Sequence, residues 1–385
     1  MLIKKFPKGV LLLSFVSFFT DIASEMLYPV TPIFLTAVLG SSMAVVGIIE
    51  GIAEITAGFL KGYFGNLSDK LGKRSIFIIL GYGISALSKP IPGLIASVPA
   101  VAVSRTADRV GKGIRTAPRD ALLGSYSNGN TGAIFGFHRA MDTLGAAIGP
   151  LIAILLLYLF PENYQLVFLI AFVPSVIAVF LTFLVKDRPM LSKNKAGTNY
   201  SVFWKEVSGE YKFILIMITI FSFVNSSDVF LILKSRFISD SNTIAILGYV
   251  FFNIIYSIFS YPLGHFSDKY GKKTIFSLGL VVFSLVYLGF ALITESFLIW
   301  LLFALYGIYS AATEGVSKAW VTDMVSEAWH GSAIGLLTMC SSFAIMFGSF
   351  AAGVLWDYFG ETVPFLISSI VSFLIAIILF FKAKP

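Results

Sequence analysis

The stretch Gly65-Asn66-Leu67-Ser68-Asp69-Lys70-Leu71-Gly72-Lys73-Arg74 has a second copy in this chain, Gly264-His265-Phe266-Ser267-Asp268-Lys269-Tyr270-Gly271-Lys272-Lys273. Each copy follows the second long apolar segment of its half of the chain. The glycines allow a tight turn, and the basic residues favour the headgroup layer of a membrane. The aspartate of each copy can accept hydrogen bonds from the amides at a helix N-terminus. A pattern that recurs at equivalent positions predicts two parallel halves of a helical bundle.

The composition indicates a membrane protein. Of 385 residues, 57% are hydrophobic and 13% are charged, and the mean hydropathy is +0.87. A soluble domain has about 25% charged residues. Since a helix of about 20 apolar residues crosses a bilayer, a chain of this length predicts about twelve spans. We place these spans at residues 9–38, 42–64, 75–96, 98–122, 131–159, 164–185, 210–237, 243–263, 274–294, 296–322, 331–355 and 361–381.

The cysteine count and the net charge exclude two kinds of site. Cys340 is the only cysteine, so one copy of the chain can form neither a disulfide nor a cysteine-based zinc site. The net charge of +7 comes from basic residues clustered between apolar runs, where they orient the chain in a membrane rather than bind nucleic acid. We expect no cofactor, and the sequence leaves open whether a metal binds.

The basic residues between the spans predict the orientation of the chain. They concentrate in alternate connections, whereas the opposite connections carry acidic residues such as Glu162 and Glu295. The positive-inside rule therefore predicts a multi-pass protein of the inner (cytoplasmic) membrane with both termini in the cytoplasm. The connection at 323–330 departs from this pattern because it contains neither lysine nor arginine. The basic residues on the predicted cytoplasmic side are Lys70, Lys73, Arg74, Arg115, Arg119, Lys186, Arg188, Lys193, Lys195, Lys205, Lys269, Lys272 and Lys273.

A long polar segment divides the spans into two groups of six. Residues 187–209 are rich in lysine, serine, asparagine and glycine, which is typical of a linker. The sequence thus predicts an N-terminal six-helix bundle at 1–186, a cytoplasmic linker at 187–209 and a C-terminal six-helix bundle at 210–385.

Both copies of the repeated stretch match the loop between spans two and three that marks the major facilitator superfamily, and the chain resembles this family over all twelve spans. The resemblance implies an all-α membrane protein of two six-helix bundles related by pseudo-two-fold symmetry, with the solute site between them. In this family the loop also latches the halves together on the cytoplasmic side during the transport cycle. The residues that the resemblance assigns to this conformational latch are Gly65, Asp69, Gly72, Arg74, Gly264, Asp268 and Gly271.

Spans four and five carry two further resemblances. Arg105 matches an arginine that the family associates with proton coupling, whereas Arg109 stands where that motif has glycine. We expect Arg109, about 16 Å along its span at 1.5 Å per residue, to face an aqueous cavity or an anionic partner. Gly145, Gly149 and Pro150 resemble the antiporter motif of proton-driven exporters, without its trailing glycine pair. A close helix contact that implies no direction of transport is the alternative interpretation.

Charged residues inside the spans form the candidate site. Asp21 and Glu25 are four residues apart, as are Glu50 and Glu54, so each pair shares one helix face. Like charges on one face favour protonation of one member, which suits groups that take up and release a proton. For any single residue, a structural ion pair between helices is the alternative. The predicted substrate and proton site contains Asp21, Glu25, Glu50, Glu54, Arg105, Arg109, Arg139, Asp142, Asn225, Asp228, Glu314 and Lys318.

These features predict a secondary active transporter that exports a small charged or zwitterionic solute by proton-coupled antiport and alternating access. The chain contains no Gly-x-x-x-x-Gly-Lys-Ser/Thr loop for an ATP-driven pump. It also lacks His-Glu-x-x-His and Gly-x-Ser-x-Gly motifs, so we expect no enzyme activity. An importer or symporter of an organic anion, an exporter of a metal ion or metal chelate, and a substrate-sensing receptor are the alternatives. The expected partners are the solute, protons and the lipid bilayer, with the protein as a monomer.

Overall fold

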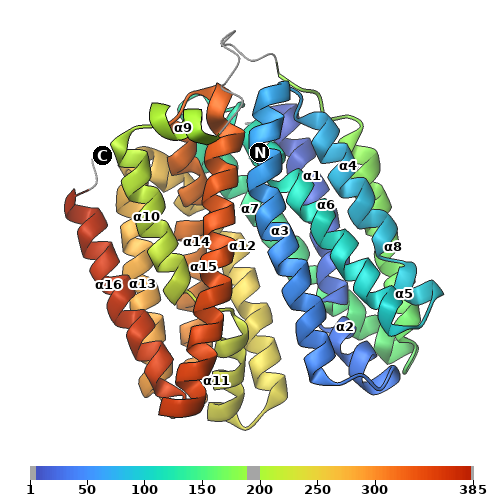
Figure 1. Cartoon of the computed structure of the whole chain (residues 1–385). Helices are drawn as coiled ribbons and strands as arrows, with labels where there is room; N and C mark the ends of the chain where they lie inside the picture. The colour runs from blue at the N-terminus through green and yellow to red at the C-terminus, as the bar shows by residue number, and fades with distance from the viewer. Residues whose placement is uncertain (1–5, 189–199, 383–385) are drawn as a thin grey trace. The chain divides into compact units, whose positions relative to one another are not determined.

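The computed structural model describes residues 6–188 and 200–382, and within these ranges the secondary structure is helical, without a β-strand. The first part of the chain forms α1 (Lys8–Leu27), α2 (Val30–Ile33), a π-helical turn (Phe34–Val38), α3 (Met43–Leu71), α4 (Ser75–Ser88), α5 (Ile91–Leu94), α6 (Val98–Gly124), α7 (Thr131–Leu159) and α8 (Tyr164–Thr182) (Figure 1). The second part forms α9 (Tyr200–Glu206), α10 (Gly209–Val224), α11 (Val229–Ser239), α12 (Asn242–Tyr270), α13 (Lys272–Leu292), α14 (Leu298–Asp323), a 3-10 turn (Glu327–Trp329), α15 (His330–Phe359) and α16 (Thr362–Lys382).

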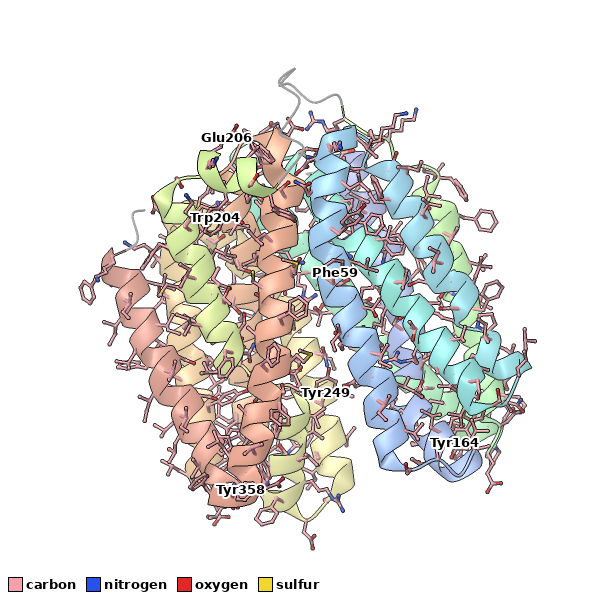
Figure 2. All side chains as sticks on the ribbon, viewed as in Figure 1. Phe59, Tyr164, Trp204, Glu206, Tyr249 and Tyr358 are labelled. Carbon is pink, nitrogen blue, oxygen red and sulfur yellow. The ribbon has the colours of Figure 1, made fainter. Side chains whose placement is uncertain are left out.

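Ten segments among the described residues are long and apolar enough to cross a membrane, judged by length and composition. The long helices α3 and α6 are not among these ten, and both carry acidic and basic side chains along their length. Together the helices correspond to the twelve predicted spans. Exposed aromatic side chains occur near helix ends, as Figure 2 shows for Trp204 on α9 and Tyr358 on α15. Such amphipathic rings favour the boundary between membrane and water.

Three of the predicted spans are interrupted, and the third, 75–96, is divided into α4 and α5 at Lys89 and Pro90. The first ends its regular helix at Leu27 and resumes at Val30 after Pro29, which has no amide hydrogen to continue the hydrogen-bond ladder. The seventh is divided into α10 and α11 by the segment 225–228. The sequence predicts each as one continuous span, because hydropathy averaged over about 20 residues does not detect a break of a few residues.

The repeated stretch is mostly helix, which corrects the prediction of a loop. α3 continues through Leu71 and α12 through Tyr270. The turn comprises residues 72–74 in the first copy and Gly271 alone in the second. Gly72 has a φ of 63° and Gly271 a φ of 92°, and these values favour glycine. The predicted linker 187–209 likewise contains a short helix, α9, and the part of it at 189–199 lies outside the described residues.

The helices pack into two compact units. The first unit consists of Met1–Tyr126, Met141–Trp204 and Val325–Met339. Within it α3 and α4 pack against α6, and α1 and α4 pack against α8. Its apolar core includes Met26, Phe34 and Phe168. The first unit therefore contains the beginning of α15 in addition to helices from the first half of the sequence.

The second unit consists of Ser127–Ala140, Lys205–Met324 and Cys340–Pro385. Within it α12 and α13 pack against α14, and α13 packs against α16. Its core is aromatic, with the rings of Phe283 and Tyr287 stacked at 4.0 Å between centroids. The beginning of α7 belongs to this unit, in the same way that the beginning of α15 belongs to the first. The boundaries of the two bundles predicted at 1–186 and 210–385 stay a prediction.

Candidate functional site

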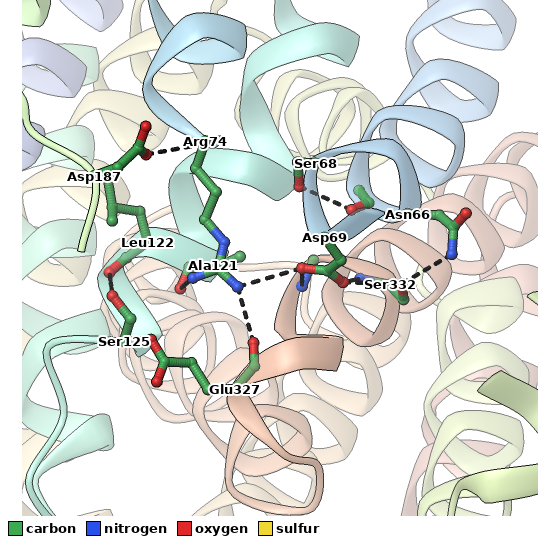
Figure 3. A network of polar contacts seen from close by, with 12 residues as sticks. Asn66, Ser68, Asp69, Arg74, Ala121, Leu122, Ser125, Asp187, Glu327 and Ser332 are labelled. Atoms are coloured by element: carbon green, nitrogen blue, oxygen red, sulfur yellow. Dashed lines mark hydrogen bonds and ion pairs between the residues drawn. The ribbon is translucent and has the colours of Figure 1, made fainter. Parts of the chain in front are cut away.

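The carboxylate of Asp69 binds the beginning of α15 inside the first unit (Figure 3). Its Oδ1 accepts a hydrogen bond from the amide of Gly331 at 3.0 Å, and its Oδ2 accepts one from the amide of Ser332 at 2.6 Å. The hydroxyl of Ser332 donates a further bond to Oδ2 at 2.9 Å. Since α15 begins at His330, these amides belong to its unpaired first turn, where a negative charge is favoured. The sequence predicted this kind of contact for the aspartate.

Arg74 connects this contact to neighbouring segments of the first unit (Figure 3). Its Nη2 lies 3.3 Å from Oδ1 of Asp69 and donates a hydrogen bond to the carbonyl of Glu327 at 2.9 Å. Its Nη1 donates to the carbonyl of Ala121 at 3.1 Å. The buried guanidinium therefore binds α3, α6 and the turn that precedes α15 at the same time.

Glycines allow α3 and α15 to touch at this point. A Cβ atom added at Gly65 would lie 2.3 Å from the carbonyl oxygen of Gly331, and one added at Gly331 would lie 2.5 Å from the carbonyl oxygen of Gly65. Any side chain at either position would force the two backbones apart. Gly65 therefore sets the distance that lets Asp69 reach the first turn of α15.

The second copy of the stretch makes the corresponding contact inside the second unit. The amides of Gly132 and Ala133, at the beginning of α7, donate hydrogen bonds to Oδ1 and Oδ2 of Asp268, each at 2.8 Å. Lys272 lies 3.0 Å from the same carboxylate. A Cβ atom at Gly264 would lie 2.2 Å from the carbonyl oxygen of Gly132. Both copies thus bind the first turn of a helix from the other half of the sequence, whereas their role as a latch during transport stays a prediction.

Two arginines of α6 pair with two glutamates of α3 in the first unit. Nε and Nη2 of Arg105 donate to the two carboxylate oxygens of Glu50 at 2.7 and 2.6 Å. Nη2 of Arg109 lies 3.1 Å from Glu54. Both acids and both arginines are spaced by four residues, so the two helices present matching faces. The anionic partner predicted for Arg109 is therefore present, and the side chain of Glu54 is 49% exposed.

The other predicted acids of the first unit, Asp21, Glu25 and Asp142, lie where α1 crosses α7, and two glycines of α7 allow this close crossing. A Cβ atom at Gly145 would lie 2.4 Å from the carbonyl oxygen of Phe18, and one at Gly149 would lie 2.6 Å from that of Ile22. This close approach, on the helix that contains Pro150, supports the alternative interpretation of the antiporter-like motif as a tight helix contact.

The crossing of α1 and α7 brings two carboxyl groups together. Asp21 of α1 and Asp142 of α7 lie within hydrogen-bonding reach of each other. Glu25, one turn further along α1, has Lys112, Arg109 and Arg105 of α6 close enough to act on it electrostatically. The sequence had paired Asp21 with Glu25, and the structure adds Asp142 as the nearer acidic partner.

A buried ion pair that was not predicted from the sequence joins the turn after α4 to α6. Nζ of Lys89, which is 2% exposed, lies 2.8 Å from Oδ1 of Asp108. The hydroxyl of Ser85 donates to the same oxygen at 2.8 Å and accepts a hydrogen bond from Arg115 at 2.7 Å. This network binds α6 to α4, whereas Arg105 and Arg109 bind α6 to α3. A single lysine within the apolar segment 75–96 was the signal that could have found it.

The remaining predicted residues lie in the second unit. Arg139 of α7 forms an ion pair with Glu314 of α14 and donates a hydrogen bond to the hydroxyl of Tyr256. The side chain of Glu314 is 49% exposed in the middle of its span. Asp228 accepts a hydrogen bond from the hydroxyl of Tyr306 at 2.6 Å. Asn225 and Asp228 lie on either side of the break in the seventh span, and Lys318 lies one turn after Glu314 on α14.

These helices and their ion-paired intramembrane charges define a multi-pass membrane transporter rather than an enzyme. The chain belongs to the Major Facilitator Superfamily, whose family model matches residues 13–239 and 214–385. The MFS-type transporter MJ1317 of Methanocaldococcus jannaschii is 35% identical over 384 residues, which is 98% of this chain and 96% of that protein. The MFS-type transporter YqjV of Bacillus subtilis is 30% identical over 124 residues, 31% of this chain and 29% of that protein.

Solved structures with a similar fold are distant in sequence. The E. coli fucose:proton symporter FucP has a TM-score of 0.80 at 13% identity, covering 98% of each chain. The proton:xylose symporter XylE has a TM-score of 0.77 at 17% identity, covering 98% of this chain and 95% of its own. At these identities the likeness establishes the fold, and the all-α major facilitator architecture predicted from the sequence is confirmed.

Proposed function

We propose that the protein is a proton-coupled secondary active transporter that exports a small charged or zwitterionic solute by antiport. The observation that carries this proposal is the carboxyl pair of Asp21 and Asp142 at the crossing of α1 and α7. A hydrogen bond between two carboxyl groups needs one proton, and two carboxylates held this close do not both ionise readily. Such a pair can hold one proton within a span and release it when its surroundings change.

The neighbouring charges support a coupling between proton and solute. Arg105 and Arg109 are paired with Glu50 and Glu54 in this structure, and the glutamates are partly exposed. An anionic group of the solute can replace these glutamates as the partner of the arginines, because guanidinium binds carboxylate and phosphate in a bidentate manner. Lys112 acts electrostatically on Asp21, so a change of charge at one of these groups changes the stability of the charge on the other. Alternating access then links the flux of protons to the flux of solute.

Proton symport is the second candidate, and the solved structures are the observation that favours it. FucP and XylE are both described as proton symporters. The argument for export is the resemblance of Gly145, Gly149 and Pro150 to an antiporter motif. The close contact of α7 with α1 is a second explanation for the two glycines, and this explanation requires no particular direction of transport. The carboxyl pair is compatible with either direction.

Reconstitution in liposomes distinguishes these candidates. Solutes are first selected by thermal stabilisation of the purified protein, and a gradient of a selected solute is then imposed across liposomes that contain a pH-sensitive dye. Antiport is expected to move protons against the direction of the solute flux, whereas symport moves them with it. Solute flux without proton movement, after subtraction of protein-free liposomes, would contradict the proposal in both forms.

We further propose that the repeated stretch faces the cytoplasm of a cell whose inner membrane holds the protein. With Cys340 replaced by serine, single cysteines at the exposed positions Lys70 and Lys269 should react with an impermeant maleimide only from the cytoplasmic side. A cysteine at the exposed Glu295 should react from the outside and serves as the control. Labelling of Lys70→Cys in intact cells would reverse the proposed orientation. Lys195, also predicted to be cytoplasmic, lies outside the described residues.

A further inference from the structure

The break in the seventh span gathers oxygen atoms inside the second unit. α10 ends at Val224 and α11 begins at Val229, so the segment 225–228 has no regular helix within the apolar run 209–239. The C-terminus of α10 carries the negative end of its dipole. The carboxylate of Asp228 lies at the other side of the break, at the N-cap position of α11, without a capping hydrogen bond from its side chain.

Two polar atoms at this break are buried and have no hydrogen-bond partner. One is Oδ1 of Asn225, and the other is the hydroxyl of Tyr287, a residue that is 1% exposed. The Tyr287 hydroxyl approaches Ser226 and Tyr306, but neither approach has the geometry of a hydrogen bond. Buried polar groups in native proteins are nearly always satisfied by protein, water or an ion. Two such atoms beside one carboxylate therefore point to a bound species.

The charge of Asp228 shows what kind of species fits. Among the described residues Asp228 forms no ion pair, and its hydrogen-bond partner is the Tyr306 hydroxyl. Arg139 acts on Asp228 only from a distance, and Glu314, with which Arg139 is paired, opposes that effect. By contrast Glu50, Glu54 and Glu314 each pair with an arginine. An uncompensated carboxylate in an apolar interior is strongly unfavourable.

The side chains around the half-buried Asp228 are aromatic. Tyr306 is 2% exposed, and its ring lies 4.8 Å from that of Phe252 and 6.4 Å from that of Tyr287. Such a setting strengthens electrostatic attraction and disfavours a hydrated or highly charged ion. One negative charge and neutral oxygen donors match a single positive charge on a hard cation.

We propose that the break in the seventh span binds Na⁺, with the carboxylate of Asp228, Oδ1 of Asn225 and the hydroxyl of Tyr287 as ligands. Tyr306 positions the carboxylate by donating its hydroxyl hydrogen to it. Unwound segments of transporter helices, where acceptors are freed from the helix ladder, are suited to this task. The site goes beyond the proposed proton and solute chemistry, because it assigns a second ion to a different unit of the protein.

The test is binding of ²²Na⁺ to the purified full-length protein in detergent at constant ionic strength, without solute and without a gradient. The wild-type protein is expected to bind Na⁺ saturably. Asp228→Asn is expected to weaken this binding by at least about tenfold, because it removes the compensating charge, and Asn225→Ala to weaken it less. Asp357→Asn, which removes an exposed carboxylate from the end of α15 in the same unit, should leave it unchanged.

The outcomes of this experiment separate the site from the proposed transport function. Absence of saturable binding to the wild-type protein overturns the proposal even if every variant fails to fold. Undiminished binding to Asp228→Asn overturns the assigned ligands. Displacement of ²²Na⁺ by methylammonium at lower concentration than by unlabelled Na⁺ would assign the site to an organic ammonium group instead. Since no proton gradient is used, failure here leaves proton coupling intact, and loss of proton coupling in liposomes leaves Na⁺ binding intact.

Discussion

Asp21→Asn and Asp142→Asn, introduced singly, are expected to reduce transport driven by a pH gradient by more than about tenfold, which corresponds to a change of about 1.4 kcal/mol or more. Either change leaves one carboxyl group and one amide, which can form a hydrogen bond without sharing a proton. The proton carrier is then lost, although the volume and the contact between α1 and α7 are kept. Solute exchange at equal pH on both sides should survive, because it requires no net movement of protons.

The measurement is solute flux in liposomes, with and without a pH gradient, for each variant. Glu25→Gln is expected to have a smaller effect, because the groups acting on Glu25 include three basic side chains of α6. Glu295→Gln, an exposed acid between α13 and α14, is the matched control. If Asp21→Asn and Asp142→Asn both kept full gradient-driven transport, the proton route would have to pass through other acids, with Glu50 and Glu54 first.

Most of the fold could be predicted from the sequence because apolar length is decisive in a membrane. The predicted span 131–159 coincides with α7, since polar residues at Asn130 and Glu162 bracket an apolar run. The interruptions were not predicted, because a break of a few residues changes average hydropathy little. The segment Asn225-Ser226-Ser227-Asp228 nevertheless consists of residues that favour turns over helix interiors, and this was the available signal.

For the site, the sequence could predict only which residues of one helix share a face, because helical spacing carries no information about neighbouring helices. Four-residue spacing predicted that Glu50 and Glu54 share one face of their helix. It could not show which face meets which, so the pairing of Glu50 with Arg105 required the packing of α3 on α6. The contact between Asp21 and Asp142 depends on how closely α1 approaches α7, which is set by glycine positions along two helices.

Asp69→Asn is expected to slow the transport cycle by roughly 10- to 150-fold while solute affinity at equilibrium stays near that of the wild type. Asparagine keeps one acceptor oxygen, and its amide group faces one of the two α15 amides that the carboxylate now accepts from. A hydrogen bond to a charged group contributes about 1.5–3 kcal/mol, and loss of that amount shifts a two-state equilibrium by roughly this factor. The weakened ion pair with Arg74 acts in the same direction.

Two measurements check this expectation. Amide hydrogen exchange of the segment 325–339 should become faster in Asp69→Asn, because the first turn of α15 loses its acceptor, and turnover in liposomes should fall in parallel. Asp240→Asn is the matched control, since Asp240 is exposed and has a positive φ of 50° that asparagine tolerates. The latch role would be wrong if Asp69→Asn lost solute affinity at equilibrium but kept normal exchange kinetics. A group that binds helix amides, the Ser332 hydroxyl and Arg74 can affect the solute only through the conformational equilibrium.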